Sequence, residues 1–294
     1  TGFVPDTFIA ENIMLLKMIQ DEMDKQNEDA YMVFLDMEKA FDRCSWDYLI
    51  PALQRIGFGQ DFIDYVQLAY SYDHPPQRRL HVNGYLGSPF GLYSGVAQGC
   101  PLSPLLFLLV SEPLSRMFNA GGCEDSEAAG VRIRGVTIAG REFRISQYAD
   151  DSTLILRPGD EAATRLTLQT WQRGTAMSEN DKKREDLLLG RLAKERHRAP
   201  TGVIKDDNWA ADGTTIRVLG APMGNNFDIE AWYTGRYRTV KARVGIWRGM
   251  AGVSLTGRNM LLQSILYGSF RFWLYFMVMP ESVIDIIEED AKQI

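Results

Sequence analysis

The 294-residue sequence contains little cysteine and little histidine. These residues are widely scattered, at Cys44, Cys100, Cys123, His74, His81 and His197. Such spacing provides neither a disulfide framework nor a zinc site. A chain with so few thiols is expected in a reducing compartment, so we predict an intracellular protein of the nucleus or cytoplasm that is not secreted.

Long hydrophobic runs are also missing. The longest apolar stretches, around Pro104–Val110 and Phe272–Met279, are short and bounded by polar residues, so no membrane partner is expected. The chain starts at Thr1 without an initiator methionine and stops at Ile294 inside a helical pattern. We therefore expect a piece of a longer polyprotein, or of a decayed element.

The sequence lacks the overall positive charge that is typical of nucleic-acid-binding proteins, because its formal net charge is −6. Positive charge is concentrated locally between Ala231 and Met279, which contains no Asp or Glu. The basic residues there are Arg236, Arg238, Lys241, Arg243, Arg248, Arg258 and Arg271. Aromatic residues are interleaved with them, including Trp232, Tyr233, Tyr237, Trp247, Phe270 and Trp273. This segment either follows a nucleic-acid backbone or forms amphipathic helices with solvated arginines and core aromatics.

The hydrophobic periodicity predicts a chain of alternating helices and strands, with a length that suits two domains. We expect helices at Glu11–Asp24, Trp46–Ile56, Gln60–Tyr72 and from Asp160 to about Met177. The run from Ala30 to Leu35 is rich in β formers and predicts a buried strand that ends at Asp36. A Gly- and Pro-rich loop starting at Val96 is expected to lead into an apolar helix.

Turn residues predict further hairpins. Asn83-Gly84 is typical of a two-residue hairpin turn, and strand-like pieces flank Ala139-Gly140. A further hairpin from Arg144 to Leu156 carries the adjacent carboxylates Asp150 and Asp151 at its tip.

Asp36, Asp150 and Asp151 form a candidate metal site if their strands are neighbours. Phosphoryl transfer from a nucleoside triphosphate requires cations, and Mg²⁺ prefers hard oxygen ligands from a few carboxylates. Each element has an ordinary structural explanation too, because an Asp at a strand end often caps it and Asp-Asp is common in turns. The apolar residues that flank both elements favour central strands, and hence the metal site.

Three strings resemble motifs A, B and C of reverse transcriptases, specifically those of non-LTR (LINE-like) retrotransposons. They are FLDMEKAFD at residues 34–42, GVAQGCPLSPLLF at 95–107 and YADD at 148–151, in the order of that family. Weaker resemblance extends over nearly the whole chain. It includes GFVP at 2–5, ENI at 11–13, VLGAPMG at 218–224, LTGR at 255–258 and FMVMP at 276–280.

The resemblance implies an α+β right-hand polymerase fold, with fingers, a palm made of an antiparallel sheet plus helices, and a helical thumb. Fingers and palm would occupy residues 1–215, and a primer-grip-like segment with a truncated thumb would occupy residues 216–294. The implied activity is RNA-directed DNA polymerase, a nucleotidyltransferase that extends a primer in retrotransposition. Its implied partners are an RNA template, a DNA primer, deoxynucleoside triphosphates and further domains of a polyprotein.

The resemblance also assigns roles to individual residues. Asp36, Asp150 and Asp151 would bind two Mg²⁺ ions, with Mn²⁺ as a possible substitute. Phe41 would exclude ribonucleotides, unless it is simply a core residue. Gln98 and Gly99 would contact the incoming nucleotide and template, and Leu219 and Gly220 would belong to the primer grip. Lys183 would donate a proton to the leaving pyrophosphate, unless its charged segment is only a solvated surface.

Departures from the family pattern leave alternatives open. Asp6-Thr7 stands where the family usually has Gly-Arg, which removes a basic group expected near the triphosphate, and Ala176 replaces a usual glycine. One alternative is a catalytically silent relic or a domesticated fold that only binds nucleic acid or protein. A group II intron maturase or telomerase-like polymerase is the enzymatic alternative, which the LINE-like context of YADD and the thumb-side sequence disfavour.

Overall fold

The computed structural model describes residues 2, 4, 6–180, 184–202, 208–248 and 254–292. The chain divides into two compact units. The first contains Thr1–Thr7 and Met18–Trp209, and the second contains Phe8–Lys17 and Ala210–Ile294. Helix α1 (Ile9–Gln26) contributes residues to both. The predicted division between residues 215 and 216 stays a prediction.

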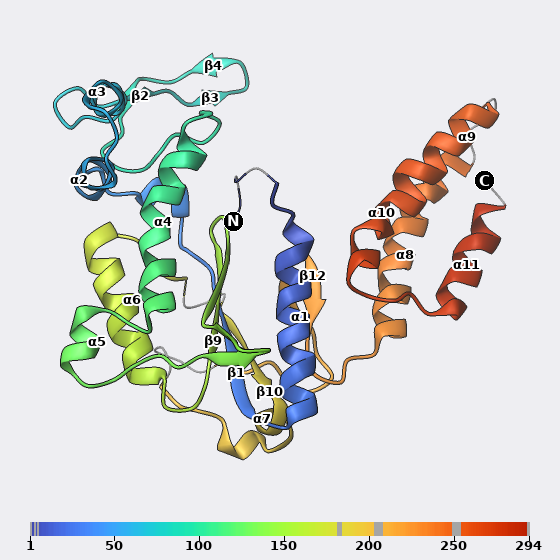
Figure 1. Cartoon of the computed structure of the whole chain (residues 1–294). Helices are drawn as coiled ribbons and strands as arrows, with labels where there is room; N and C mark the ends of the chain where they lie inside the picture. The colour runs from blue at the N-terminus through green and yellow to red at the C-terminus, as the bar shows by residue number, and fades with distance from the viewer. Residues whose placement is uncertain are drawn as a thin grey trace. The chain divides into compact units, whose positions relative to one another are not determined.

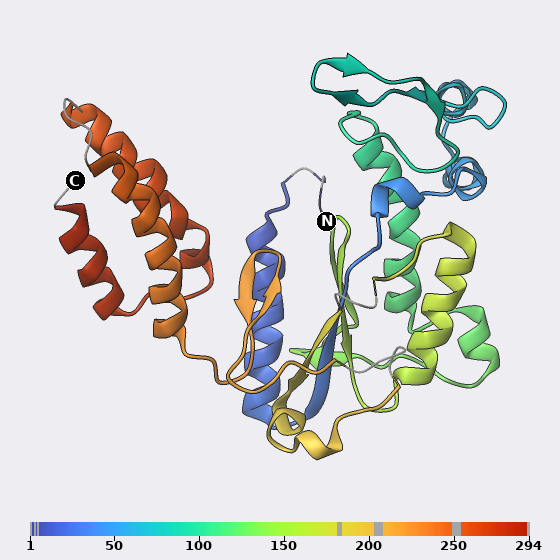
Figure 2. The ribbon, with the colours of Figure 1, turned by 180° about the vertical axis from the view of Figure 1, so that it is seen from behind.

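The first unit is built on a four-stranded antiparallel sheet with the order β10-β1-β9-β8 (Figures 1 and 2). Its strands are β1 (Asp29–Leu35), β8 (Ile145–Tyr148), β9 (Asp151–Leu156) and β10 (Glu185–Leu189). Strand β1 is central and buried on both faces, with Tyr31 and Val33 in the main core cluster and the intervening Met32 outside it. Burial on both faces explains why this strand is a continuous apolar run, and the mixed architecture agrees with the predicted α+β class.

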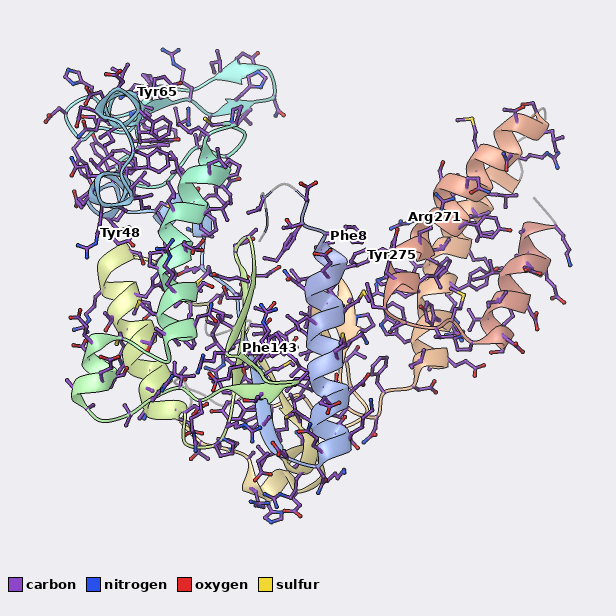
Figure 3. The ribbon with its side chains drawn as sticks, in the orientation of Figure 1. Phe8, Tyr48, Tyr65, Phe143, Arg271 and Tyr275 are labelled. Carbon is purple, nitrogen blue, oxygen red and sulfur yellow. The ribbon has the colours of Figure 1, made fainter. Side chains whose placement is uncertain are left out.

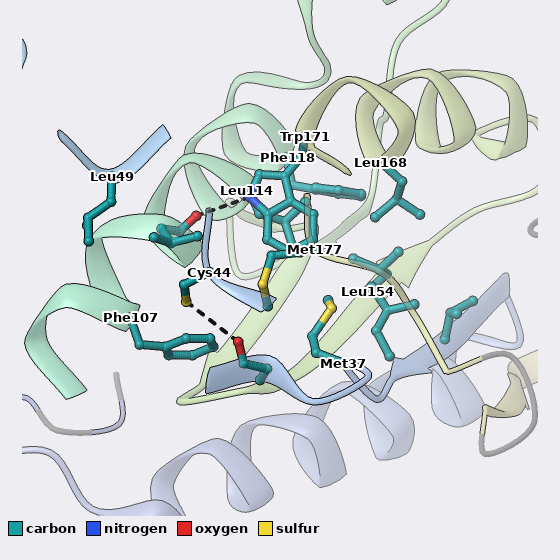
Figure 4. Close-up of a cluster of buried hydrophobic side chains, with 14 of the residues drawn as sticks. Met37, Cys44, Leu49, Phe107, Leu114, Phe118, Leu154, Leu168, Trp171 and Met177 are labelled. Carbon is teal, nitrogen blue, oxygen red and sulfur yellow. Dashed lines mark hydrogen bonds between the residues drawn. The ribbon is translucent and has the colours of Figure 1, made fainter. Parts of the chain in front are cut away.

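Six α-helices and two short 3₁₀ turns accompany this sheet among the described residues of the first unit. They are η1 (Ala40–Arg43), α2 (Trp46–Ile56), α3 (Gln60–Ala69), α4 (Ser103–Ala120), α5 (Glu124–Ala128), α6 (Glu161–Thr175), α7 (Gly190–Lys194) and η2 (Arg196–Arg198). Helix α4 begins with a proline in its first turn and buries Phe107, Val110 and Leu114 at helical spacing. In the core, the Trp171 Nε1 donates to the Val110 carbonyl at 3.2 Å (Figure 4).

The helices predicted at Glu11–Asp24, at Trp46–Ile56 and from Asp160 have the expected positions. The helix predicted at Gln60–Tyr72 is α3, which ends at Ala69 instead of continuing to Tyr72. Tyr70 leaves the helix with φ −136° and ψ 84°, and its side chain is buried. Its hydroxyl lies 3.3 Å from the Ser103 Oγ and accepts a hydrogen bond from the Ala97 N–H at 3.1 Å. Hydrogen bonds to residues distant in the sequence therefore end this helix, and no local sequence pattern predicts them.

Short antiparallel ladders make up the rest of the strands in the first unit. They are β2 (Gln77–Arg78) with β5 (Phe90–Gly91), β3 (His81–Val82) with β4 (Tyr85–Leu86), and β6 (Val136–Ile138) with β7 (Arg141–Phe143). Asn83 and Gly84 have φ values of 50° and 87°, as a two-residue hairpin turn requires. Both the Asn83-Gly84 hairpin and the β8–β9 hairpin that carries the paired carboxylates are confirmed as predicted.

The second unit combines one short β-ladder with a helical cluster. Its elements are β11 (Ile216–Val218), β12 (Ala221–Met223), α8 (Ile229–Arg248), α9 (Leu255–Leu261), η3 (Leu262–Tyr267), α10 (Gly268–Arg271), η4 (Trp273–Tyr275) and α11 (Glu281–Ala291). Tyr233, Tyr237 and Phe270 are buried in its core. Phe8 meets Tyr275 edge-on at 5.2 Å between ring centroids (Figure 3).

The basic segment of this unit therefore follows the amphipathic alternative, at least for its aromatics. Three of them pack inward, while Arg238 and Arg243 are exposed on α8. Arg236 stacks over Trp232 and Trp273 at 5.2 and 5.7 Å. None of the helices in the part of the chain that the structure describes combines the length and hydropathy needed to cross a membrane.

Candidate active site

The three candidate carboxylates lie at one edge of the sheet, on adjacent strands. Leu35 of β1 pairs with Ser152 of β9, so Asp36 and Asp151 are the next residues of the two antiparallel strands in the same register. Asp150 precedes Asp151 in the β8–β9 turn, which is closed by the Tyr148–Asp151 pair. Ala149 completes this turn with a left-handed φ of 55°. Strand register alone therefore brings residues 115 positions apart in the sequence to the same edge.

The three carboxylates interact electrostatically. Partial burial and the negative charges of Asp150 and Asp36 raise the pKa of Asp151 to about 6. Burial is the larger of these causes, and the charges of the two neighbouring carboxylates add to it. A divalent cation would relieve this like-charge repulsion, and carboxylate oxygens are the ligands that Mg²⁺ and Mn²⁺ prefer.

The donor chemistry therefore fits a hard divalent cation, but the ligands are not gathered into a ready-made cage. Among the described residues, no group of three or more His, Cys, Asp and Glu side chains is arranged to hold a metal ion. Mg²⁺ commonly uses only one or two protein carboxylates and takes its other ligands from water and substrate phosphates. An open carboxylate edge is consistent with that mode of binding.

Asn180 lies beside Asp36 and was not identified from the sequence. Its backbone N–H donates to the Asp36 carbonyl at 2.8 Å, and its side-chain Nδ2 donates to the Asp36 carboxylate at 3.3 Å. The neighbouring bridge between Met37 and Glu179 holds the two segments antiparallel. Asn180 could have been recognised only through this tertiary bridge, because it lies 144 residues after Asp36.

A second close approach joins the segment after Asp36 to the Gly- and Pro-rich loop. The Val96 N–H donates to the Phe41 carbonyl at 2.7 Å, and the Gly95 N–H donates to the Cys44 carbonyl at 2.9 Å. A Cβ on Gly95 would lie 2.7 Å from the Asp42 Cα, so only glycine permits this approach. The Trp46 Nε1 donates to the Gly95 carbonyl at 2.8 Å. These contacts bring residues 41–46 and 95–98 together.

Phe41 is half-buried against the core. Its ring lies nearly parallel to that of the buried Phe107, with 4.9 Å between centroids and 15° between planes. One part of the Phe41 side chain therefore packs against the core, while another part remains accessible to solvent. Phe41 lies five residues after Asp36 in the chain.

Gln98 and Gly99 are exposed beside this region. The Gln98 Nε2 lies 3.5 Å from the Asp42 Oδ1, and both side chains line one pocket of about 540 Å³. Gly99 has a left-handed φ of 86° with no atom near its potential Cβ, so its conformation rather than space favours glycine. A ligand in the pocket can reach Gln98, and Gly99 is exposed beside it.

The departures from the family pattern fall on special backbone positions. Asp6 and Ala176 have φ values of 59° and 60°, in the left-handed region that glycine adopts at the lowest cost. Ala176 is the residue that ends α6. Gly2 is buried, and a Cβ there would lie 2.6 Å from the Ala149 nitrogen at the tip of the carboxylate hairpin. Gly2, from the GFVP string at residues 2–5, therefore packs against Ala149 of the YADD string at residues 148–151.

The remaining predicted site residues are Lys183, Leu219 and Gly220, whose roles stay predictions. Lys183 lies outside the described residues. Leu219 and Gly220 belong to the second unit, where they form the left-handed turn between β11 and β12 with φ values of 49° and 86°. The Gly220 carbonyl accepts a hydrogen bond from the Trp273 Nε1 at 3.0 Å. Their primer-grip role stays a prediction.

Comparison with known proteins agrees with the motifs. The family model described as reverse transcriptase (RNA-dependent DNA polymerase) matches residues 1–222. The Transposon TX1 uncharacterized 149 kDa protein of Xenopus laevis is 27% identical over 267 residues, which cover 89% of this chain and 19% of that protein. The Retrovirus-related Pol polyprotein from type-2 retrotransposable element R2DM of Drosophila melanogaster is 34% identical over 168 residues, or 57% and 14% of the two chains.

This chain thus spans less than a fifth of either relative. A solved structure, apo telomerase from Candida tropicalis truncated from its C-terminal domain, covers 67% of this chain and 36% of that one. Its TM-score of 0.43 and identity of 16% are too low to add to the assignment. The resemblance to non-LTR retrotransposon proteins is confirmed by the family model and by the two retrotransposon relatives. The chain belongs to the reverse transcriptase (RNA-dependent DNA polymerase) family.

Proposed function

We propose that this chain is the polymerase region of a retrotransposon reverse transcriptase, which extends a DNA primer on an RNA template. The observation that carries the proposal is the meeting of Asp36 with Asp150 and Asp151 on adjacent strands, within the matched family region. Retrotransposition is the context that the TX1 and R2DM relatives support. The other domains of such polyproteins would supply functions that this chain does not carry.

In this proposal the four-stranded sheet with α4 and α6 is the palm, and α2, α3 and the β2–β5 region belong to the fingers. The helical cluster of the second unit, with Leu219-Gly220 before it, would be the primer grip and thumb. This assignment follows the order of the motifs along the chain.

Each residue of the site would have its own role. Asp36, Asp150 and Asp151 would hold two divalent ions, which neutralise the triphosphate and activate the attacking hydroxyl of the primer. Asn180 would orient the Asp36 carboxylate through its Nδ2 hydrogen bond. Phe41, fixed by its stacking on Phe107, would present its ring edge where a ribose 2′-hydroxyl would otherwise fit. Gln98 would contact the nascent base pair from the adjacent loop.

Primer extension tests the proposal directly. The purified chain is incubated with poly(rA)/oligo(dT), dTTP and Mg²⁺ or Mn²⁺, beside Asp150→Asn and the exposed control Asp61→Asn. We expect extension by the wild-type chain and by Asp61→Asn, and none by Asp150→Asn. A folded wild-type chain that binds primer–template without extending it would instead support the alternative, a catalytically silent nucleic-acid-binding fold.

A further inference from the structure

The segment that joins α3 to α4 forms an exposed arm with an unusual charge pattern. From His74 to Ser111 the sequence contains no Asp or Glu, but it contains two arginines and two histidines. Apolar side chains on the arm are strongly exposed: Leu80 by 65%, Val82 by 60%, Tyr85 by 81%, Leu86 by 65% and Tyr93 by 61%. An exposed surface of this kind usually marks an interaction site.

The arm is a continuous double strand rather than a disordered loop. The ladders β2–β5 and β3–β4 follow one another, and the Gly87 N–H donates to the Leu80 carbonyl at 2.8 Å between them. Figure 1 shows the β3–β4 end projecting beyond α3 and α4. At the base of the arm, the Leu92 N–H donates to the Pro76 carbonyl at 3.0 Å. The exposed side chains therefore have a defined support.

The pocket of about 540 Å³ lies at the base of this arm, within the first unit. Its wall includes Trp46, Tyr70, Arg78 and Tyr93 from the fold, with Asp42 and Gln98 from the segments beside the carboxylate edge. The Tyr93 ring lies against the bare α-carbon of Gly91, because a Cβ there would lie only 3.3 Å from its Cε2 atom. The pocket thus joins an exposed aromatic ring and a cation to residues of the candidate active site.

The two arginines at this site are available for an anionic ligand. Among the residues that the structure describes, no carboxylate forms an ion pair with Arg78 or Arg79, and both side chains are exposed. Exposed aromatic rings stack on unpaired bases, and unpaired arginines neutralise phosphates, so this combination is typical of single-strand binding. Asp42 in the wall disfavours a phosphate deep in the pocket but can accept a hydrogen bond from a base amino group.

We propose that the arm and its pocket bind the unpaired 5′ part of the RNA template ahead of the primer end, an inference that rests on the proposed polymerase function. The template is the strand that offers unpaired bases ahead of a growing primer, and the pocket adjoins Gln98. The phosphates of the template contact Arg78 and Arg79, and one of its bases stacks on Tyr93 at the mouth of the pocket. The arm then guides template into the site.

The test measures how much affinity the template overhang contributes. Fluorescence anisotropy, without nucleotide, gives Kd for one RNA–DNA duplex whose 5′ RNA overhang is either one or eight nucleotides long. For the wild-type chain we expect the longer overhang to bind about tenfold more tightly. Arg78→Ala with Arg79→Ala, and separately Tyr93→Ala, should reduce this ratio to about threefold or less. Tyr93→Phe should keep it, because the stacking face remains.

Arg55→Ala is the matched control, since Arg55 is an exposed arginine of α2 that lines a different pocket. It should leave the ratio unchanged, and it should bind and extend the one-nucleotide overhang like the wild-type chain. An unchanged ratio in folded Arg78→Ala/Arg79→Ala and Tyr93→Ala proteins would overturn the inference. Because the ratio needs no catalysis, a chain that binds as expected but extends no primer would contradict the polymerase function and leave this binding result standing.

Discussion

Phe41 stacks on Phe107 with 15° between the ring planes, so one aromatic pair joins the segment after Asp36 to the core helix α4. Phe107 is 1% exposed, whereas Phe41 is half-buried. The core-residue explanation for Phe41 and its proposed role in sugar selection are therefore compatible. The buried ring of Phe107 would hold the accessible part of Phe41 in place.

Replacing Phe41 should separate these two contributions. We expect Phe41→Val to incorporate ribonucleotides about two to three decades more readily relative to deoxynucleotides, because the hydroxyl clash is removed. Loss of the ring contact should also lower the free energy of unfolding by about 1–2 kcal/mol. The measurements are single-nucleotide extension with each substrate and urea unfolding. Phe107→Leu is the control for packing, and an unchanged sugar ratio in folded Phe41→Val would leave only the packing role.

The carboxylate edge should bind divalent cations before any substrate is present. We expect Asp36→Asn and Asp151→Asn each to weaken Mn²⁺ binding, measured by electron paramagnetic resonance of free Mn²⁺. Extension should fall by about three decades with both deoxy- and ribonucleotides, since cations contribute several kcal/mol to this transition state. EDTA should abolish extension by the wild-type chain. Full Mn²⁺ affinity in both variants would place the metal elsewhere.

Asn180 should act as a positioning residue for Asp36. Its Nδ2 donates to the carboxylate at 3.3 Å, so Asn180→Ala should lower kcat by about tenfold or more while changing the KM for dTTP little. Gln172→Ala is a suitable control, because Gln172 donates to the adjacent Glu179 at 2.9 Å and not to Asp36. Equal effects of the two substitutions would show that Asn180 only supports the local fold.

Asp29 should make the stability of the fold depend on pH in the acidic range. Its carboxylate accepts hydrogen bonds from the Arg191 Nε at 2.9 Å and Nη2 at 2.6 Å, and from Arg198 at 3.1 Å. The Arg191 hydrogen bond, together with the charges of Arg191 and Arg198, holds the pKa of Asp29 below its usual value. A lowered pKa stabilises the fold at pH values above the unfolded-state pKa of about 3.9, and this stabilisation is lost as the pH falls through the lower folded-state pKa.

We therefore expect the melting temperature of the wild-type chain to fall more steeply below about pH 4 than that of Asp29→Asn, which has no charge to lose. Thermal unfolding between about pH 3 and 7 measures this difference. Asp61→Asn, in the exposed first turn of α3, should follow the wild-type curve. Parallel curves for wild type and Asp29→Asn would mean that the Arg191 contact contributes nothing in solution.

Ala176 should be a site where glycine stabilises the protein. Its φ of 60° is costly for alanine, so Ala176→Gly should raise the free energy of unfolding by about 0.5–1 kcal/mol. Ala162 lies in the first turn of the same helix, α6, and Ala162→Gly should lower the free energy of unfolding by about 0.5 kcal/mol. Urea unfolding compares the two. The prediction is wrong if both substitutions destabilise the chain equally.

The sequence by itself determined the parts of this protein that depend on contiguous residues. The apolar run before Asp36 predicted a buried central strand, and Asn83-Gly84 predicted its hairpin, because strand burial and turn geometry are local properties. The three motif strings identified the family for the same reason, since each carries its chemistry within a few neighbouring positions. The register that places Asp36 opposite Asp151 was expected only on the condition that the two strands are neighbours.

Only the tertiary structure decided the contacts between distant segments. The hydrogen bond from Asn180 to Asp36, the close approach of Gly95 to Asp42 and the stacking of Phe41 on Phe107 each join residues far apart in the sequence. Composition also left two meanings open for the aromatics between Ala231 and Met279, and packing placed Tyr233 and Tyr237 in the core. A side chain's partner depends on which surfaces come together when the chain folds, and no local pattern specifies that.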